Sequence, residues 1–355
     1  MRKITKYIVN ILFWLIVLQS ASSLFAAKKT KVVMPEWVNT PSSVYPSSSY
    51  MTYVGSGADR QSAELDALKG IASVFGQSIK SDTKSSSRMT QAKENGMVAN
   101  SSVSTIDQSI MKKVDIDSLI GVEVEFWFDQ VSTWYSIAIL DRAKATQIYQ
   151  DMITTNLGTL NSILKRVDET DFSFDSYSLY DFAEDIALEN EKHLKKLDII
   201  NQDASTSLKS KCVSSKDIRL KKTQLSKNIP IHVIVENDVD GRFEEAFYQA
   251  ISKAGFRGSY DSKVRYLLIA KFSFEESTTS DNTTIRCKYN GESYILDTVE
   301  EQQIIPYSVS GRESHMNFND AKGKAVNKII NKITSQYSQS VEDFLKEVVV
   351  EWKEY

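Results

Sequence analysis

Two stretches of the chain combine a short apolar strand with an amphipathic helix. In the first stretch, the strand Tyr50–Val54 ends at Gly55-Ser-Gly57, and the helix that follows has apolar residues at the i, i+3, i+4 and i+7 spacing of a buried stripe. This stripe consists of Leu68, Ile71, Ala72, Phe75 and Ile79. The second stretch has the strand Ile229–Val235 and a helix with the stripe Phe243, Phe247, Ile251 and Ala254, ended by Gly255. Both patterns predict a helix packed on a sheet.

Alternating segments follow the first helix and predict antiparallel strands. Val122, Val124, Phe126 and Phe128 alternate with Glu123, Glu125 and Trp127, which predicts a strand with one apolar face. Tyr135, Ile137 and Ile139 alternate in the next strand. In the helix before them, the small residues Ala63, Ala67 and Gly70 should let the helix lie close to this sheet.

The second half repeats this order. Val264–Phe274 alternates as a long strand, and Asn290-Gly291 predicts a hairpin turn between Thr284–Tyr289 and Ser293–Val299. A strand around Ile304–Ser310 and a long helix from about Asn319 complete the pattern. The fold class predicted is therefore α+β, with two small domains, each built as strand, helix, three antiparallel strands and helix.

The segment between the two halves is helical in pattern. Residues 146–204 predict a helical hairpin that joins the domains, and Ser205–Asn228, which is rich in Ser, Thr and Lys, reads as a linker. The predicted domains are then residues 27–145 and 229–355.

The N-terminus has the pattern of a secretory signal peptide. Arg2, Lys3 and Lys6 precede the apolar run Tyr7–Leu18, and small residues follow up to Ala27. We expect cleavage after Ala26 and export to the periplasm or to a site associated with the outer membrane. Removal of residues 1–26 leaves 40 basic and 46 acidic residues, and this mildly acidic balance argues against nucleic acid and against simple docking on anionic lipid.

Three segments within residues 35–145 follow one another in a recognisable order: Pro35-Glu-Trp-Val38, Tyr53-Val-Gly-Ser-Gly-Ala-Asp59 with the helix after it, and Trp134–Ala145. In these segments the chain resembles the LPP20 family of bacterial envelope lipoproteins. This resemblance implies a non-catalytic envelope protein. The family's lipidated Cys is missing, since no Cys precedes Cys212. The resemblance therefore implies a variant without a lipid, with membrane contact only through a partner. The C-terminal half is similar in element order to domains of envelope assembly factors.

Candidate chemistry is sparse. His193, His232 and His315 have no second His or Cys at ligand spacing, so we expect no metal site and no cofactor. Asp59 and Glu64, at the first helix, are typical of residues that complement a helix dipole. Cys212 and Cys287 could form a disulfide in an exported protein, or remain two unrelated thiols.

Aromatic side chains supply the candidate partner surface. Trp37, Trp127 and Trp134 are predicted to form an exposed patch on the first domain, against the alternative that they are core. The C-terminal heptad positions, which include Tyr337 and Phe344, pack on their own domain or pair with a partner helix.

Three functions fit this sequence. The favoured one is a non-catalytic exported protein that binds envelope proteins or the cell wall and supports envelope or surface-appendage architecture, with self-association through exposed strand edges as a further expectation. The second is a regulator that docks on a peptidoglycan-synthesising enzyme through its C-terminal domain. The third is a hydrolase that uses Asp59 and Glu64.

Overall fold

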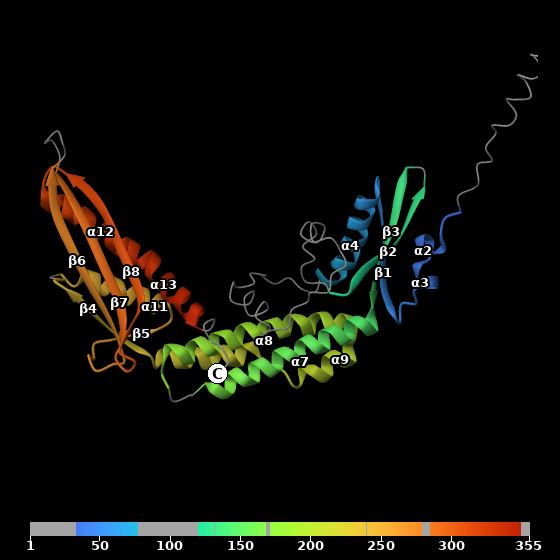
Figure 1. Ribbon diagram of the computed structural model, residues 1–355, viewed down its shortest axis with the longest axis horizontal. Helices are drawn as coiled ribbons and strands as arrows, with labels where there is room; N and C mark the ends of the chain where they lie inside the picture. Colours follow the sequence, from blue (N-terminus) through green and yellow to red (C-terminus); the bar gives the residue numbers. More distant parts are fainter. Residues whose placement is uncertain are drawn as a thin grey trace, which may run out of the picture.

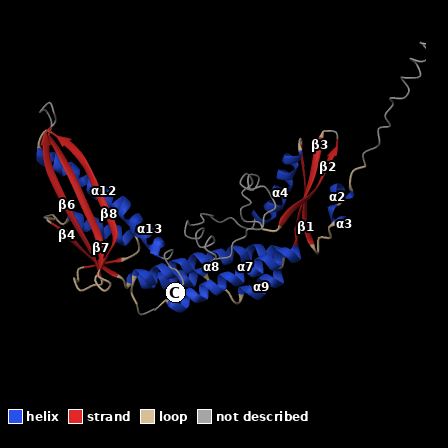
Figure 2. Cartoon of the chain, viewed as in Figure 1, coloured by secondary structure: helices blue, strands red, loops and turns tan. Residues whose placement is uncertain are grey.

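The protein has an α+β architecture in which two sheets lie at opposite ends of a helical arm (Figure 1). The computed structural model describes residues 33–76, 120–130, 132–167, 171–238, 240–278 and 285–348. The predicted signal peptide and Ile79 lie outside these residues. Helices form the arm and cover the sheets, as Figure 2 shows. In the described part of the chain, no helix is long and apolar enough to cross a membrane.

The N-terminal domain is a three-stranded antiparallel sheet of order β1-β3-β2. Its elements are α2 (Glu36–Asn39), α3 (Pro41–Val44), β1 (Tyr50–Gly57), α4 (Arg60–Gly76), β2 (Val122–Gln130) and β3 (Thr133–Asp141). The Asp59 carboxylate caps α4 by accepting a hydrogen bond from the Ser62 N–H at 2.7 Å. Ala63 and Ala67 of α4 are fully buried beside Gly55 of β1, so the close contact predicted from these small residues is present.

A β-bulge divides β2 into two parts whose apolar side chains point to opposite faces of the sheet. The pairing with β3 shifts between Val124 and Phe126, so Val124 lies opposite Ala138 whereas Phe126 lies opposite Ile137. Ala138 belongs to the core under α4, and Ile137 belongs to a small cluster on the other face of the sheet. The prediction that residues 122 to 128 keep one apolar face is therefore wrong, because the bulge moves Phe126 to the opposite face.

The arm consists of four helices. The hairpin is formed by α7 (Arg142–Arg166) and α8 (Phe174–Ile200), and α9 (Gln202–Lys209) and α10 (Ser215–Lys227) pack along α8. Residues 205–228 are thus helical rather than a linker. Although polar in composition, this segment buries Leu208, Ile218 and Leu225, which are enough to hold two short helices against α8.

The C-terminal domain is a five-stranded sheet of order β5-β4-β6-β7-β8. Strand β4 (Pro230–Glu236) pairs in parallel with β5 (Arg257–Ser259) and β6 (Tyr266–Thr278), while β7 (Ile285–Asp297) and β8 (Gln302–His315) are antiparallel. Helix α11 (Arg242–Lys253) follows β4. The predicted Asn290-Gly291 hairpin is wrong: both residues lie inside β7, and a Cβ on Gly291 would come within 2.4 Å of the Phe272 ring. Glycine is needed there for packing, not for a turn.

The C-terminal helix packs on its own domain. It comprises α12 (Phe318–Lys332), a π-helical segment η1 (Ile333–Tyr337) and α13 (Ser338–Val348). Its apolar stripe is buried in the main core, through residues that include Ile329, Ile333, Val341 and Leu345. The heptad spacing left two alternatives open, packing on the chain's own domain or pairing with a partner helix. In the structure this helix packs within the chain.

Both ends of α8 are attached to a sheet. At the C-terminal end, the Arg142 guanidinium donates to the Ile199 and Ile200 carbonyls (3.2 and 2.7 Å) and, through Nε, to the Ser47 carbonyl before β1 (3.2 Å). At the N-terminal end, Phe174 stacks on Tyr266 of β6 with ring centroids 4.1 Å apart. One hydrophobic core runs from α4 through the arm to α13. The two sheets are therefore joined through one continuous core.

An ion pair beside this second attachment should make stability depend on pH. Arg265 binds Asp297 through two hydrogen bonds (2.9 and 3.0 Å) and reaches Asp171 at 3.1 Å. Burial alone would raise the pKa of Asp297, but the hydrogen bonds from Arg265 and two backbone N–H groups outweigh it and hold this pKa below its usual value. Nearby, burial raises the pKa of Asp175, which has the opposite effect on stability.

A depressed carboxyl pKa stabilises the fold above the unfolded value of about 3.9 and loses that effect as the pH falls through the folded value. We therefore expect Asp297→Asn to lower the free energy of unfolding most at neutral pH, with the difference from the wild type shrinking below about pH 4. Urea titrations of both proteins between about pH 3 and pH 7 measure this difference in the free energy of unfolding. The exposed Asp203→Asn is the control, and a deficit for Asp297→Asn that stays constant with pH would contradict the assignment.

Candidate binding surfaces

The three tryptophans predicted as one patch lie on two different faces of the N-terminal sheet. Trp127 pairs opposite Ser136, and Trp134 opposite Gly57, on the face that α4 covers. Trp37 is buried on the other face, against Ile137 and Ile139. The prediction of a common Trp37, Trp127 and Trp134 surface is therefore wrong, because α2 folds Trp37 under the sheet.

The aromatic groups that remain accessible belong to β2. Trp127 is exposed and carries the Arg60 guanidinium 3.6 Å from its ring centroid, a cation–π contact. Phe126 is 45% exposed on the opposite face, where it stacks near Trp37. Trp134 is half-buried. Strand β2 is an edge of this sheet, so these rings flank an edge rather than form a continuous patch.

The C-terminal candidates are core residues. Tyr337 is fully buried in η1 and packs edge-on against Phe247 and Tyr307, at 5.1 and 5.3 Å. Burial raises its pKa, since the phenolate could not be solvated there. Phe344 is half-buried on α13, the helix that packs against α8. Neither ring is placed to lead a partner contact.

The two cysteines are separate thiols. Cys212 is half-buried after α9, and Cys287 is buried in β7. Burial raises the pKa of both thiols, which lowers the reactive thiolate fraction at neutral pH.

The histidines and the N-terminal carboxylates have structural neighbours. His232 Nδ1 lies 2.9 Å from the Ser259 carbonyl, and His315 Nδ1 lies 3.1 Å from Asp320. Within the described ranges, no three His, Cys, Asp or Glu side chains come together as metal ligands would. Glu64 forms an ion pair with Arg60 at 2.9 Å, while Asp59 caps the helix start. These two carboxylates do not form the facing pair of acid and base that a glycosidase needs.

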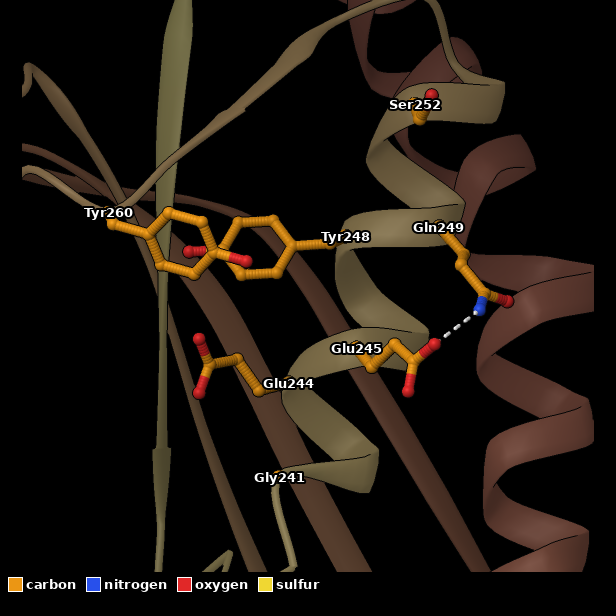
Figure 3. Close-up of a pocket in the computed structure, with 7 residues that line it drawn as sticks. All are labelled: Gly241, Glu244, Glu245, Tyr248, Gln249, Ser252 and Tyr260. Atoms are coloured by element: carbon orange, nitrogen blue, oxygen red, sulfur yellow. Dashed lines mark hydrogen bonds between the residues drawn. The ribbon is translucent and has the colours of Figure 1, made fainter.

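A hollow on the outer side of α11 is a site that the sequence did not indicate (Figure 3). It has a volume of about 710 Å³, and its lining consists of Gly241, Glu244, Glu245, Tyr248, Gln249, Ser252 and Tyr260. We call it the α11 notch. The Glu244 side chain and the two tyrosine rings lie on the same side of the helix, with the ring centroids 5.3 Å apart.

The walls of the notch differ in how firmly they are held. The Tyr248 hydroxyl donates to the Ser259 carbonyl (2.7 Å) and accepts from the Val233 N–H (3.3 Å). Its ring lies against Gly258, where a Cβ would come within 2.6 Å. Burial raises the Tyr248 pKa. Tyr260, by contrast, is 83% exposed. Glu245 lies on the other side of α11, where its carboxylate accepts a hydrogen bond from the Gln249 side chain at 3.2 Å. The Glu244 carboxylate and the two rings suit a cationic group, through charge and cation–π contact.

The sequence carried part of this signal. Glu244 and Tyr248 are four residues apart on a predicted helix and so share a face. Tyr260 joins them only because β5 pairs with β4 and brings the loop after it over α11, which the sequence pattern did not show.

Comparisons with known proteins find solved structures of low similarity and no family. No protein-family model matches the chain, and no curated protein matches it. Among solved structures, the secreted protein HP1454 from Helicobacter pylori has a TM-score of 0.40 and 12% identity, over 81% of this chain and 97% of that one. The rare lipoprotein B from Shewanella oneidensis has a TM-score of 0.25 and 12% identity, over 35% of this chain and 99% of that one.

The lipoprotein GNA1162 from Neisseria meningitidis has a TM-score of 0.21 and 17% identity, over 30% of this chain and 99% of that one. These neighbours are secreted proteins and lipoproteins. Membership of the LPP20 family stays a prediction from the motifs quoted above.

Proposed function

We propose that the protein is a non-catalytic exported component of the cell envelope that holds two binding domains apart and so connects two partners. The observation that supports this is the attachment of α8 at both ends, to the loop before β1 through Arg142 and to β6 through Phe174. A continuous core that is fixed at both ends keeps the two sheets at a constant separation and orientation. An adaptor that positions two partners requires such a fixed arrangement, whereas a flexible tether does not.

Each end of the arm offers a different contact surface. The N-terminal sheet presents the edge strand β2 with Trp127 and Phe126, and an exposed edge can accept a strand from a partner. The C-terminal domain presents the anionic, aromatic α11 notch. Since the two surfaces differ in chemistry, we assign them to different partner proteins.

Site-specific photo-cross-linking in intact cells tests this function. A benzophenone amino acid replaces Trp127 in one strain and Tyr260 in another, and captured proteins are identified by mass spectrometry. We expect a different envelope protein from each position. Met316, which is 85% exposed at the turn before α12, is the matched control position and should capture neither.

Other outcomes would change the assignment. Capture of a peptidoglycan-synthesising enzyme from Tyr260 would favour the regulator instead. Failure to capture any protein from either position, or the same set from all three, would contradict the adaptor.

A further inference from the structure

A basic surface lies on the arm, although the chain as a whole is slightly acidic. Residues 205–228 contain seven Lys or Arg residues and one acidic residue, Asp217. Subtracting these from the chain's 43 basic and 46 acidic residues leaves 36 and 45, so the rest of the chain is clearly acidic. The exposed lysines of this segment are Lys209, Lys211, Lys216, Lys221 and Lys227, which we call the basic strip.

The packing of α10 fixes where the strip points. Ile218 and Leu225 are buried against α8. Lys216, Leu220 and Lys227 are spaced by four and seven residues, which places them together on the opposite face of the helix, and all three are exposed. The charges of Lys216 and Lys227 are therefore directed away from α8.

Ion pairing with α8 uses other members of the segment. Arg219 pairs with Glu184, and Lys222 pairs with Asp181 (2.7 Å) and Glu184 (2.6 Å). Burial of Lys222 would lower its pKa, but these carboxylates outweigh it and raise the pKa. Among the described residues, the ammonium groups of Lys209, Lys211, Lys216 and Lys227 form no ion pair or hydrogen bond.

Apolar side chains lie among these charges. Leu220 is 59% exposed in the middle of the α10 face. Phe172, just before α8, is 45% exposed and lines a hollow of about 220 Å³ together with Lys221 and Tyr180. Lysines that surround exposed Leu and Phe side chains are the combination by which peripheral proteins bind the headgroup region of a bilayer.

We propose that the basic strip docks the arm directly on a bilayer surface that contains anionic phospholipid. Lysine ammonium groups are flexible point charges, without the fixed fork by which arginine recognises a single carboxylate or phosphate, so they suit a diffuse anionic surface. Leu220 and Phe172 would enter the headgroup layer. The proposal goes beyond the adaptor function, does not depend on it, and replaces the sequence expectation of indirect membrane contact, which averaged the charge over the whole chain.

Co-sedimentation of the mature chain with vesicles tests the proposal. The vesicles contain equal parts of phosphatidylglycerol and phosphatidylcholine, or phosphatidylcholine alone. We expect binding to the anionic vesicles only, weakened by salt. Replacing Lys216 and Lys227 by alanine should weaken it about thirtyfold, at roughly 1 kcal/mol for each lysine near the surface. Leu220→Ser should weaken it further.

The matched control removes two exposed lysines from the C-terminal domain, Lys253→Ala with Lys324→Ala, and should leave binding unchanged. All four positions are exposed, so circular dichroism should show native folding in both double variants. The proposal would be overturned if the wild type did not bind anionic vesicles or if the control double variant lost as much vesicle binding as Lys216→Ala with Lys227→Ala. Competition by dissolved glycerol phosphate would also overturn it, because it would indicate a pocket for one phosphate. Capture of an acidic protein by the strip without vesicle binding would also reject it.

Discussion

Replacing Gly55 by alanine should prevent α4 from docking on the N-terminal sheet. A Cβ at this position would lie 2.1 Å from the Ala67 nitrogen and 2.4 Å from the Ala63 carbonyl oxygen. Both are backbone atoms of a helix, so no side chain can rotate away, and the whole helix must move. We expect the free energy of unfolding to fall by about 3 kcal/mol or more, at the upper end of overpacking effects. Chemical denaturation of the purified chain measures the change.

The same substitution at Gly158 provides the control. Gly158 lies within α7 in open space, where an added Cβ would meet no atom within 4 Å. There alanine should stabilise the protein by about 0.5–1 kcal/mol, because glycine costs more backbone entropy in a helix. The two variants should therefore differ in sign. Equal destabilisation of both would show that the close approach of α4 to β1 is not what makes Gly55 necessary.

This contact also shows how far sequence patterns reach. The run of small residues in α4 and the Gly55 and Gly57 pair before it were sufficient to predict a helix lying close on a sheet, because both signals are local. The two glycines lie inside β1, paired with β3, and do not form the turn that the sequence suggested. The bulge near Glu125 was not predictable in the same way. A prediction from alternating residues assumes that every residue of a strand continues the same pleat. The extra residue in β2 is set by its pairing with β3, a separate segment of the chain, so the pattern of β2 alone does not reveal it.

The surfaces were harder to predict than the fold. Asn290-Gly291 is a strong local turn signal, yet the packing of Phe272 over Gly291 keeps it inside a long strand. Trp37 was grouped with Trp127 by its residue type, while its face is decided by the fold of α2. In segment 205–228, three buried apolar residues hold the helices against α8. The polar composition that suggested a linker comes from residues that include the exposed lysines. Local propensity thus yields to long-range packing in each case.

Replacing Phe174 by alanine should detach α8 from the C-terminal sheet. The Phe174 ring is buried, stacks on Tyr266 at 4.1 Å and meets Phe256 edge-on at 5.1 Å. Its backbone N–H donates to the Tyr266 hydroxyl at 3.0 Å, which places the ring at the start of the helix. Loss of a buried phenylalanine leaves a cavity at the joint, and we expect the free energy of unfolding to fall by about 3–5 kcal/mol.

Phe172→Ala is the matched control, two residues away and 45% exposed, and its effect should stay within about 0.5 kcal/mol. Small-angle scattering then separates a loss of stability from a loss of rigidity. If Phe174 fixes the sheet to the arm, its variant should show a broader distribution of interatomic distances than Phe172→Ala under conditions in which both are folded. An unchanged distribution would mean that the other contacts across the joint, which include the Arg265–Asp171 pair and the packing of α13 on α8, hold the sheet to the arm without Phe174.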